Sequence, residues 1–165
     1  MTKTMKVAIL VDLMGSGAQS AEDEVKEHKK KFRQLLKPAK SQFYQIYSFY
    51  ADNIQPGTNL VLFDFGGMMP GSDDLVTSNC REVIKWAQDN PSSLVMVMSS
   101  FTYSRYLKLE MEDLGLRELP NIVSYYDNLD DPFPQWFHDL YGPRSTVSPE
   151  IIGLLQRPAC FRNKS

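Results

Sequence analysis

Acidic and hydroxyl side chains follow four apolar segments of the sequence, and these residues are the best suited to chemistry. Asp12, Asp64 and Asp127 each close such a segment, and Ser99 closes another. Carboxylate oxygens are the ligands that Mg²⁺ prefers, and two neighbouring carboxylates repel unless a cation or a proton lies between them. The sequence therefore predicts a magnesium site formed by the three aspartates, with Asp64 and Ser99 as catalytic side chains. The alternative is that the aspartates only cap the turns that follow strands.

A glycine-containing segment, Met14–Ser20, suggests a second kind of site. It is predicted to be a loop between a strand and a helix that Ser20 caps. Backbone N–H groups at a helix N-terminus can bind a phosphate, so Gly15, Ser16 and Gly17 are candidate cofactor-binding residues for a nucleotide. The segment has no Lys-Ser/Thr ending and no third glycine, and acids follow it, so a plain flexible loop is the other interpretation.

The elements that must position these residues can be predicted from apolar runs. Continuous rather than alternating apolarity is typical of a strand that is covered on both faces. Four segments have this pattern, namely 6–12, 59–64, 93–99 and 121–127. Residues 43–50 are aromatic and partly alternating, which favours a strand at the edge of a sheet.

Helical patterns separate most of the predicted strands. They cover residues 21–37, 73–88 and 103–114, and Cys80 falls on the inward stripe of the second. The link 50–59 is too short for a full helix, so we expect one abbreviated crossover. Alternation of strands and helices requires right-handed crossovers and a parallel sheet. The predicted fold is a three-layer α/β/α sandwich with five mostly parallel strands in the order 2-1-3-4-5.

Residues 59–100 resemble the receiver domain of two-component response regulators. The similarity lies in the apolar run ending at Asp64, the Met-Pro-Gly turn at residues 69–71, and Ser99 after the next strand. The resemblance implies that Asp64 is a phosphoacceptor, Asp12 a Mg²⁺ ligand and Ser99 a switch hydroxyl. Two additional glycines precede the turn, and the lysine that the family places after its fifth strand is missing. The resemblance therefore implies a degenerate receiver-like module that binds a partner without phosphotransfer.

The segment Phe63-Asp-Phe-Gly-Gly67 is similar to the nucleophile motif of haloacid-dehalogenase-like phosphatases. This resemblance implies that Asp64 is a nucleophile and Ser99 a supporting hydroxyl. The general-acid aspartate of that family is replaced by Gly66, and the motif lies far from the first strand. The match is accordingly poorer than the match to receiver domains.

Two further segments each have two interpretations. The basic residues between 26 and 40 either contact an acidic partner or phosphates, or form the solvated face of a helix balanced by its own glutamates. They are Lys26, Lys29, Lys30, Lys31, Arg33, Lys37 and Lys40. The aromatic and acidic stretch 125–137 either packs on the sheet edge or anchors a partner.

Composition limits the class of protein. The chain has 165 residues, 42% of them hydrophobic and 23% charged, and a formal net charge of -2. The charge gives no argument for nucleic-acid binding, and no apolar run approaches the length of a membrane span. Without a signal peptide, a cytoplasmic location is expected. We expect one α/β domain over residues 1–142, with a short C-terminal helix and a flexible tail over 143–165.

These observations favour a small non-catalytic regulatory or protein-interaction module with a protein partner, whose binding surface is expected near residues 66–74 and the C-terminal aromatic segment. One alternative is a Mg²⁺-dependent phosphohydrolase or nuclease-like enzyme that uses the strand-end aspartates. Another is a nucleotide-binding protein that uses residues 15–20. Mg²⁺ is the one cofactor that the sequence suggests.

Overall fold

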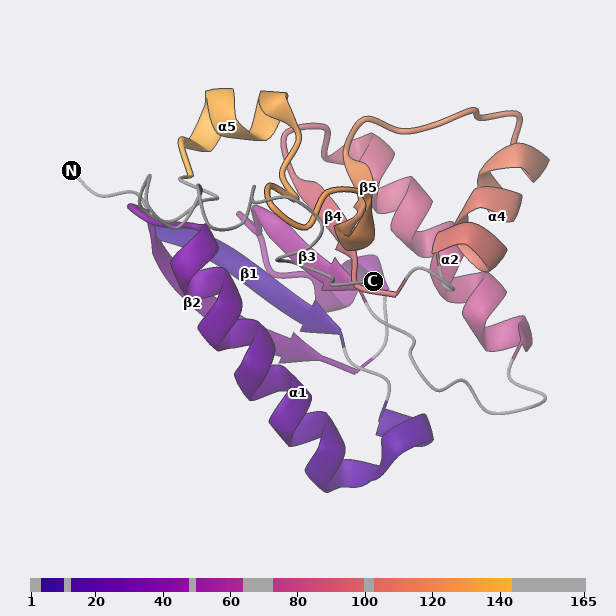
Figure 1. Cartoon of the computed structure of the whole chain (residues 1–165). Coiled ribbons are helices and arrows are strands. Elements are labelled where there is room, and N and C mark those ends of the chain that lie inside the picture. The colour runs from indigo at the N-terminus through magenta and orange to yellow at the C-terminus, as the bar shows by residue number, and fades with distance from the viewer. Residues whose placement is uncertain (1–3, 11–12, 48–49, 64–72, 100–102, 144–165) are drawn as a thin grey trace, which may run out of the picture.

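Five parallel strands form one sheet in the centre of the molecule (Figure 1). The computed structural model describes residues 4–10, 13–47, 50–63, 73–99 and 103–143. The strands are β1 (Thr4–Leu10), β2 (Lys40–Ile46), β3 (Leu60–Phe63), β4 (Leu94–Val97) and β5 (Ile122–Ser124). Their order is β2-β1-β3-β4-β5, and all neighbouring strands are parallel. The predicted strand order and three-layer α/β class are confirmed.

Helices cover both faces of this sheet (Figure 1). One face carries α1 (Leu13–Leu35) and α5 (Gln135–Tyr141), whose Phe32 and Phe137 are fully buried against it. The other face carries α2 (Asp73–Asp89), the π-helical turn η2 (Tyr103–Leu107) and α4 (Lys108–Asp113). Side chains alternate between these faces, so the continuous apolar runs in β1, β3 and β4 supply both halves of the core.

The connections follow the prediction in two respects. In the described part of the crossover from β2 to β3, residues 47 and 50–59, the one helical element is the short 3₁₀-helix η1 (Ala51–Asn53), so the crossover is abbreviated as expected. Gly115 and Gly142 follow α4 and α5 with φ angles of 74° and 66°. Glycine adopts this left-handed conformation without the steric cost that a Cβ imposes, which explains why both helices end there.

The predicted start of the first helix is wrong. Instead of a loop over Met14–Ser20 and a helix from Ala21, α1 already begins at Leu13. Glycine within a helix costs about 1 kcal/mol relative to alanine, but it does not forbid helical geometry. Residues 14–20 contain no proline, so the helix extends through Gly15 and Gly17. The prediction gave the two glycines more weight than their helix propensity justifies.

The last strand is shorter than predicted. β5 ends at Ser124, and Asp127 lies in a 3₁₀-helix, η3 (Tyr125–Asp127), rather than at a strand terminus. The Ser124 hydroxyl caps this turn by accepting a hydrogen bond from the Tyr126 N–H at 3.3 Å. A capping side chain competes with the sheet for backbone groups, which accounts for the early end of the strand.

Two other predictions concern burial and the membrane. Cys80 is a free thiol, fully buried on the inward face of α2, as its position in the helical stripe predicted. Among the described residues, no helix combines the length and the apolar composition that crossing a bilayer requires. The predicted C-terminal helix and tail after residue 143 lie outside the described residues.

Candidate functional site

The strands that precede two of the predicted acids are direct neighbours. β1 pairs with β3, and Leu10 at the end of β1 is in register with Phe63 at the end of β3. Asp12 and Asp64 themselves lie outside the described residues. Their roles as metal ligands, and the role of Asp64 in catalysis, therefore stay predictions. What the fold establishes is that the chain leaves these two strands at the same edge of the sheet.

Ser99 follows β4 at that same edge. The N–H of Met98 donates to the carbonyl of Phe63 at 2.8 Å, which holds the exit of β4 beside the exit of β3. Ser99 is half-buried and already takes part in an interaction with its surroundings. Its backbone thus lies next to the strand that precedes Asp64, as the catalytic prediction requires.

Asp127 is set apart from the other predicted ligands by the topology. It follows β5, and β4 separates β5 from β3. Adjacent strands lie about 4.8 Å apart, so β5 is roughly 10 Å from β3. The Asp127 side chain is exposed. Within the described part of the chain, no three His, Cys, Asp or Glu side chains are grouped as a metal ion would need.

Gly15, Ser16 and Gly17 lie inside α1 rather than in a loop. The nucleotide-binding alternative depended on a flexible glycine loop whose N–H groups surround a phosphate. That loop is absent from the described residues, and only the N-terminal turn of the helix stands in its place. Cofactor binding by these three residues stays a prediction without the loop geometry that motivated it.

A different surface concentrates charge among the described residues. Residues 28–40 contain six basic residues and no acid, whereas the whole chain carries a formal charge of -2. We call this surface, formed by the C-terminal part of α1 and the start of β2, the basic flank. Its charged residues are Lys29, Lys30, Lys31, Arg33, Lys37 and Lys40, of which all but half-buried Lys29 are exposed.

The cations of the basic flank form no ion pair with the acids of α1 among the described residues. Within α1 the Glu24 carboxylate lies 3.7 Å from His28 Nε2, and this contact uses no lysine. Among the residues that the structure describes, none of the six cations forms an ion pair. The interpretation in which glutamates of the same helix balance this run therefore finds no ion pairs to support it.

Helical spacing gathers part of this charge into a stripe. Lys26, Lys30 and Arg33 follow one another at intervals of four and three residues, which places them on one side of α1, and Lys37 lies in the turn directly after the helix. The Arg33 guanidinium lies 5.3 Å from the centroid of the Phe43 ring in β2. That contact shows which way the stripe faces, because β2 is the outermost strand on this side of the sheet.

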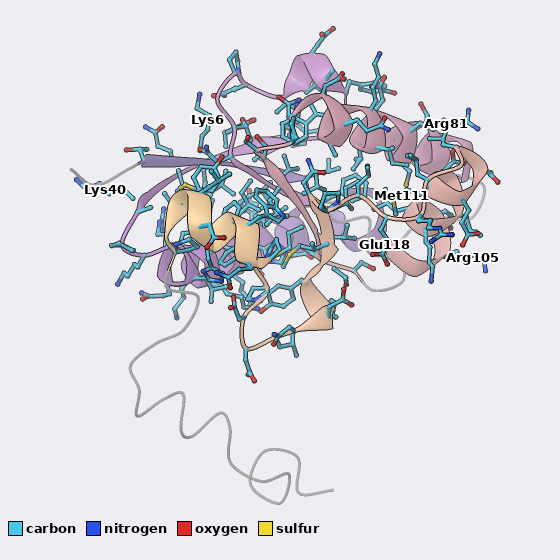
Figure 2. All side chains as sticks on the ribbon, turned by 90° about the horizontal axis from the view of Figure 1, so that it is seen from above. Lys6, Lys40, Arg81, Arg105, Met111 and Glu118 are labelled. Carbon is cyan, nitrogen blue, oxygen red and sulfur yellow. The ribbon has the colours of Figure 1, made fainter. Side chains whose placement is uncertain are left out.

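A depression of about 510 Å³ lies where α1 meets β2. Arg33, Lys37 and Lys40 line it together with Ser41. The Ser41 hydroxyl oxygen is buried and has no hydrogen-bond partner among the described residues. Figure 2 shows Lys40 at the margin of the molecule opposite to Arg81 and Arg105, so this depression is remote from the α2–α4 side. Three of its six lining residues are cationic, which suits an anionic group, and Pro38 and Ala39 contribute apolar surface.

The α2–α4 side contains a different charged pair. The Arg81 Nε donates to the Glu110 carboxylate at 2.8 Å, and this hydrogen bond raises the pKa of Arg81. Burial, and then the negative charge of Glu110, raise the pKa of the neighbouring Cys80 to about 12. The thiol is consequently neutral at physiological pH, and a neutral buried thiol has no nucleophilic role.

The aromatic stretch after β5 mainly packs on the sheet. Phe133 and Phe137 are buried and stack with their ring centroids 4.9 Å apart, and the Trp136 Nε1 donates to the Pro120 carbonyl at 2.8 Å. The packing interpretation is confirmed for these residues. His138 links two parts of the segment. Its Nε2 lies 2.9 Å from the Asp131 carboxylate, and its Nδ1 lies 3.0 Å from the Pro143 carbonyl.

Comparisons of the chain with protein-family models, with curated proteins and with solved structures found no match.

Proposed function

We propose that this chain is a small, non-catalytic interaction module with a receiver-like arrangement of strands, and that it binds an acidic protein partner on its basic flank. The observation that carries the proposal is the group of six cations in residues 28–40 that form no ion pair among the described residues. The strand order β2-β1-β3-β4-β5 is compatible with a receiver-like module, and flavodoxin-like proteins share it.

Electrostatics supports an external partner for this charge. Six like charges in thirteen residues repel one another, and nothing within the described part of the chain offsets them through a salt bridge. A partner with carboxylates would relieve that repulsion and gain attraction at the same time. Outside the six cations of the flank the chain carries 12 basic and 20 acidic residues, so the flank is a positive region on an otherwise acidic chain and its field would guide such a partner.

The proposal can be tested with a fluorescein-labelled peptide of ten glutamates and fluorescence anisotropy. Reversing three charges of the flank, in the variant Lys30→Glu/Arg33→Glu/Lys37→Glu, should weaken binding at least about tenfold, since each exposed pair contributes on the order of 0.2–1 kcal/mol and each reversal adds repulsion. Binding by the wild type should also weaken in 0.5 M salt, which screens exposed charges.

A control with the same net charge separates the flank from general electrostatics. The variant Lys85→Glu/Lys108→Glu/Arg117→Glu reverses three exposed cations on other elements. We expect its affinity for the peptide to stay within about threefold of the wild type, because charges beyond roughly 10 Å are screened at 0.1 M salt. Equal losses in both triple variants would contradict a localised site.

A second candidate function is a Mg²⁺-dependent phosphohydrolase or nuclease-like reaction that uses Asp12 and Asp64. The observation that favours it is the direct pairing of β1 with β3, which a shared metal between these strands requires. The test is the thermal unfolding midpoint with Mg²⁺, and with Mg²⁺ plus beryllofluoride. A ligand at 100 times its dissociation constant stabilises a fold by about 2.7 kcal/mol.

The two aspartates must account for that shift if the second candidate holds. Asp64→Asn should abolish the shift, whereas Asp89→Asn, which alters an exposed acid at the end of α2, should keep it. The absence of any shift in the wild type would argue against the enzyme and leave the interaction module.

A further inference from the structure

The outer edge of β2 can be identified from the hydrogen bonds of β1. The Lys6 carbonyl accepts a hydrogen bond from the Asn59 N–H at 2.9 Å, so the backbone groups of Lys6 point toward β3. Backbone groups alternate along a strand, and the groups of the odd-numbered residues of β1 therefore point toward β2. Val7 is one of these residues, and its partner in β2 is Phe43.

Parallel pairing then determines which groups of β2 remain. A residue that faces a parallel strand bonds to the two residues that flank its partner, so Val7 uses the even-numbered residues of β2. The N–H and C=O groups of Ser41, Phe43 and Gln45 consequently point away from β1. Since β2 is the outermost strand, no described residue provides a hydrogen bond to these outward groups.

The basic flank lies along this edge on one face of the sheet. The Arg33 guanidinium lies over the Phe43 ring, and Arg33 and Lys37 line the depression beside Ser41. In an added strand, every second side chain would point to the face that α1 covers. Carboxylates at those alternate positions would reach Arg33 of α1 and Lys37 in the turn after it.

The positive charge beside this edge distinguishes between three possible binding partners. A second copy of the chain, paired edge to edge, would bring two basic flanks together, and like charges across an interface cost free energy. Single-stranded nucleic acid supplies anions but no strand backbone that could pair with the exposed groups of β2. An acidic peptide supplies both the negative charge and the hydrogen-bonding backbone.

We infer that β2 accepts an extended acidic peptide as a sixth strand, with Asp or Glu at alternate positions directed toward Arg33 and Lys37. The inference rests on the proposed function, because it specifies the partner of the basic flank and its mode of binding. The main chain of the peptide pairs with Ser41, Phe43 and Gln45, and its acids give specificity for the basic side.

The experiment uses the full chain and the labelled peptide Thr-Glu-Val-Glu-Val-Glu-Thr, with two N-methylated forms of it. One form carries methyl groups on the glutamate amides and the other on the amides of the intervening residues. An added strand donates hydrogen bonds from one of these sets only. We expect one methylated form to bind at least about tenfold more weakly and the other within about twofold of the parent peptide.

A variant of the protein tests the same pairing by removing a hydrogen-bond donor of β2 instead of one of the peptide. Gln45→Pro removes one outward N–H without removing a bond to β1, and proline is tolerated on an edge strand in this position. It should weaken peptide binding, while Gln45→Thr, which keeps the N–H, should not. If the proline variant fails to fold, the N-methylated peptides decide the question alone.

The outcomes separate this inference from the proposed function. Binding that is lost in the triple charge variant but is equal for both N-methylated peptides would overturn strand addition and leave the basic flank as a binding surface. No binding of the parent peptide at low salt would overturn both. Tighter binding of an eight-nucleotide thymidine strand, or a dimer of the chain that the peptide does not dissociate, would also overturn the inference.

Discussion

Asn121 joins three parts of the fold through one side-chain amide. Its Nδ2 donates to the carbonyls of Ala87, Asn90 and Ser93 at 2.7, 3.0 and 3.0 Å, and the residue is only 3% exposed. These carbonyls belong to the end of α2 and to the turn that leads into β4, whereas Asn121 directly precedes β5. Its replacement should therefore destabilise the fold although the side chain is small and polar.

The magnitude for Asn121→Ala follows from the partners that remain. The Ala87 carbonyl also accepts from the Asn90 N–H, and the Asn90 carbonyl also accepts from the Ser93 N–H. The Ser93 carbonyl has no second partner among the described residues. The amide has two hydrogens, so the three contacts amount to two hydrogen bonds. Leaving the partly buried Ser93 carbonyl unpaired costs about 1–3 kcal/mol, and the loss of the other hydrogen bond costs about 1 kcal/mol. We expect a loss of about 2–4 kcal/mol in the free energy of unfolding.

Asn121→Asp should show a pH dependence that the alanine variant lacks. Burial against three carbonyl oxygens would raise the pKa of the new carboxyl above its unfolded value of about 3.9. The folded state then binds a proton that the unfolded chain releases, so stability falls as the pH rises above about 3.9. The slope is about 1.4 kcal/mol per pH unit until the folded pKa is reached. At pH 7 the aspartate variant should be less stable than the alanine variant.

Urea denaturation followed by circular dichroism, at pH 4.5 and pH 7, measures both effects. Asn90→Ala is a matched control, because its side chain makes one hydrogen bond, to the Trp86 carbonyl at 2.8 Å. We expect that control to lose about 1 kcal/mol. An Asn121→Ala variant within about 0.5 kcal/mol of the wild type would refute the reasoning. So would an aspartate variant whose stability follows the wild type between the two pH values.

Two further predictions concern buried residues. Because burial raises the pKa of Cys80 to about 12, only the unfolded chain ionises above pH 9, and stability should fall by about 1.4 kcal/mol per pH unit from pH 9 toward pH 12. Cys80→Ala should lack this pH dependence in urea denaturation. The same slope in the variant and in the wild type would contradict the prediction. Phe137→Ala removes a fully buried ring and should cost about 3–5 kcal/mol in the same assay, while Leu109→Ala, at a 53% exposed position of α4, should change stability by less than about 0.5 kcal/mol.

The sheet could be predicted because its strands carry a simple signal. Runs such as Leu60–Phe63 and Leu94–Val97 are buried at every position, and continuous apolarity with a polar end is typical of parallel central strands. β2 differs, because residues 43–50 are aromatic and partly alternating, and that pattern predicted a strand at the edge. The strand itself runs over Lys40–Ile46, earlier than predicted, and most of its residues are partly exposed. The alternation of strands and helices predicted a parallel sheet. It does not determine the order of the strands, and 2-1-3-4-5 was assumed as one of the common doubly wound orders.

The start of α1 could not be predicted from local preferences. Gly15 and Gly17 favour a loop by about 1 kcal/mol each, a difference that packing elsewhere in a long helix readily overrides. The role of Asn121 was equally hidden. Its three partners lie 28 to 34 residues away in the sequence, and only the packed fold brings them together.

The basic flank was visible in the sequence only as a run of charges. Spacing places Lys30, Arg33 and Lys37 on one side of a helix, but it does not tell which neighbour that side faces. The contact of Arg33 with Phe43 depends on the packing of α1 against β2. The outward backbone groups depend on the register between β1 and β2, and composition contains no signal for register.

The most direct test of the central claim is a ¹H–¹⁵N NMR titration of the chain with the acidic peptide. The predicted result is that the largest amide shifts fall on Ser41, Phe43 and Gln45, with further shifts at Arg33 in α1 and at Lys37 in the turn after it. Shifts centred on α2 and α4, or shifts spread evenly over exposed lysines, would contradict the account.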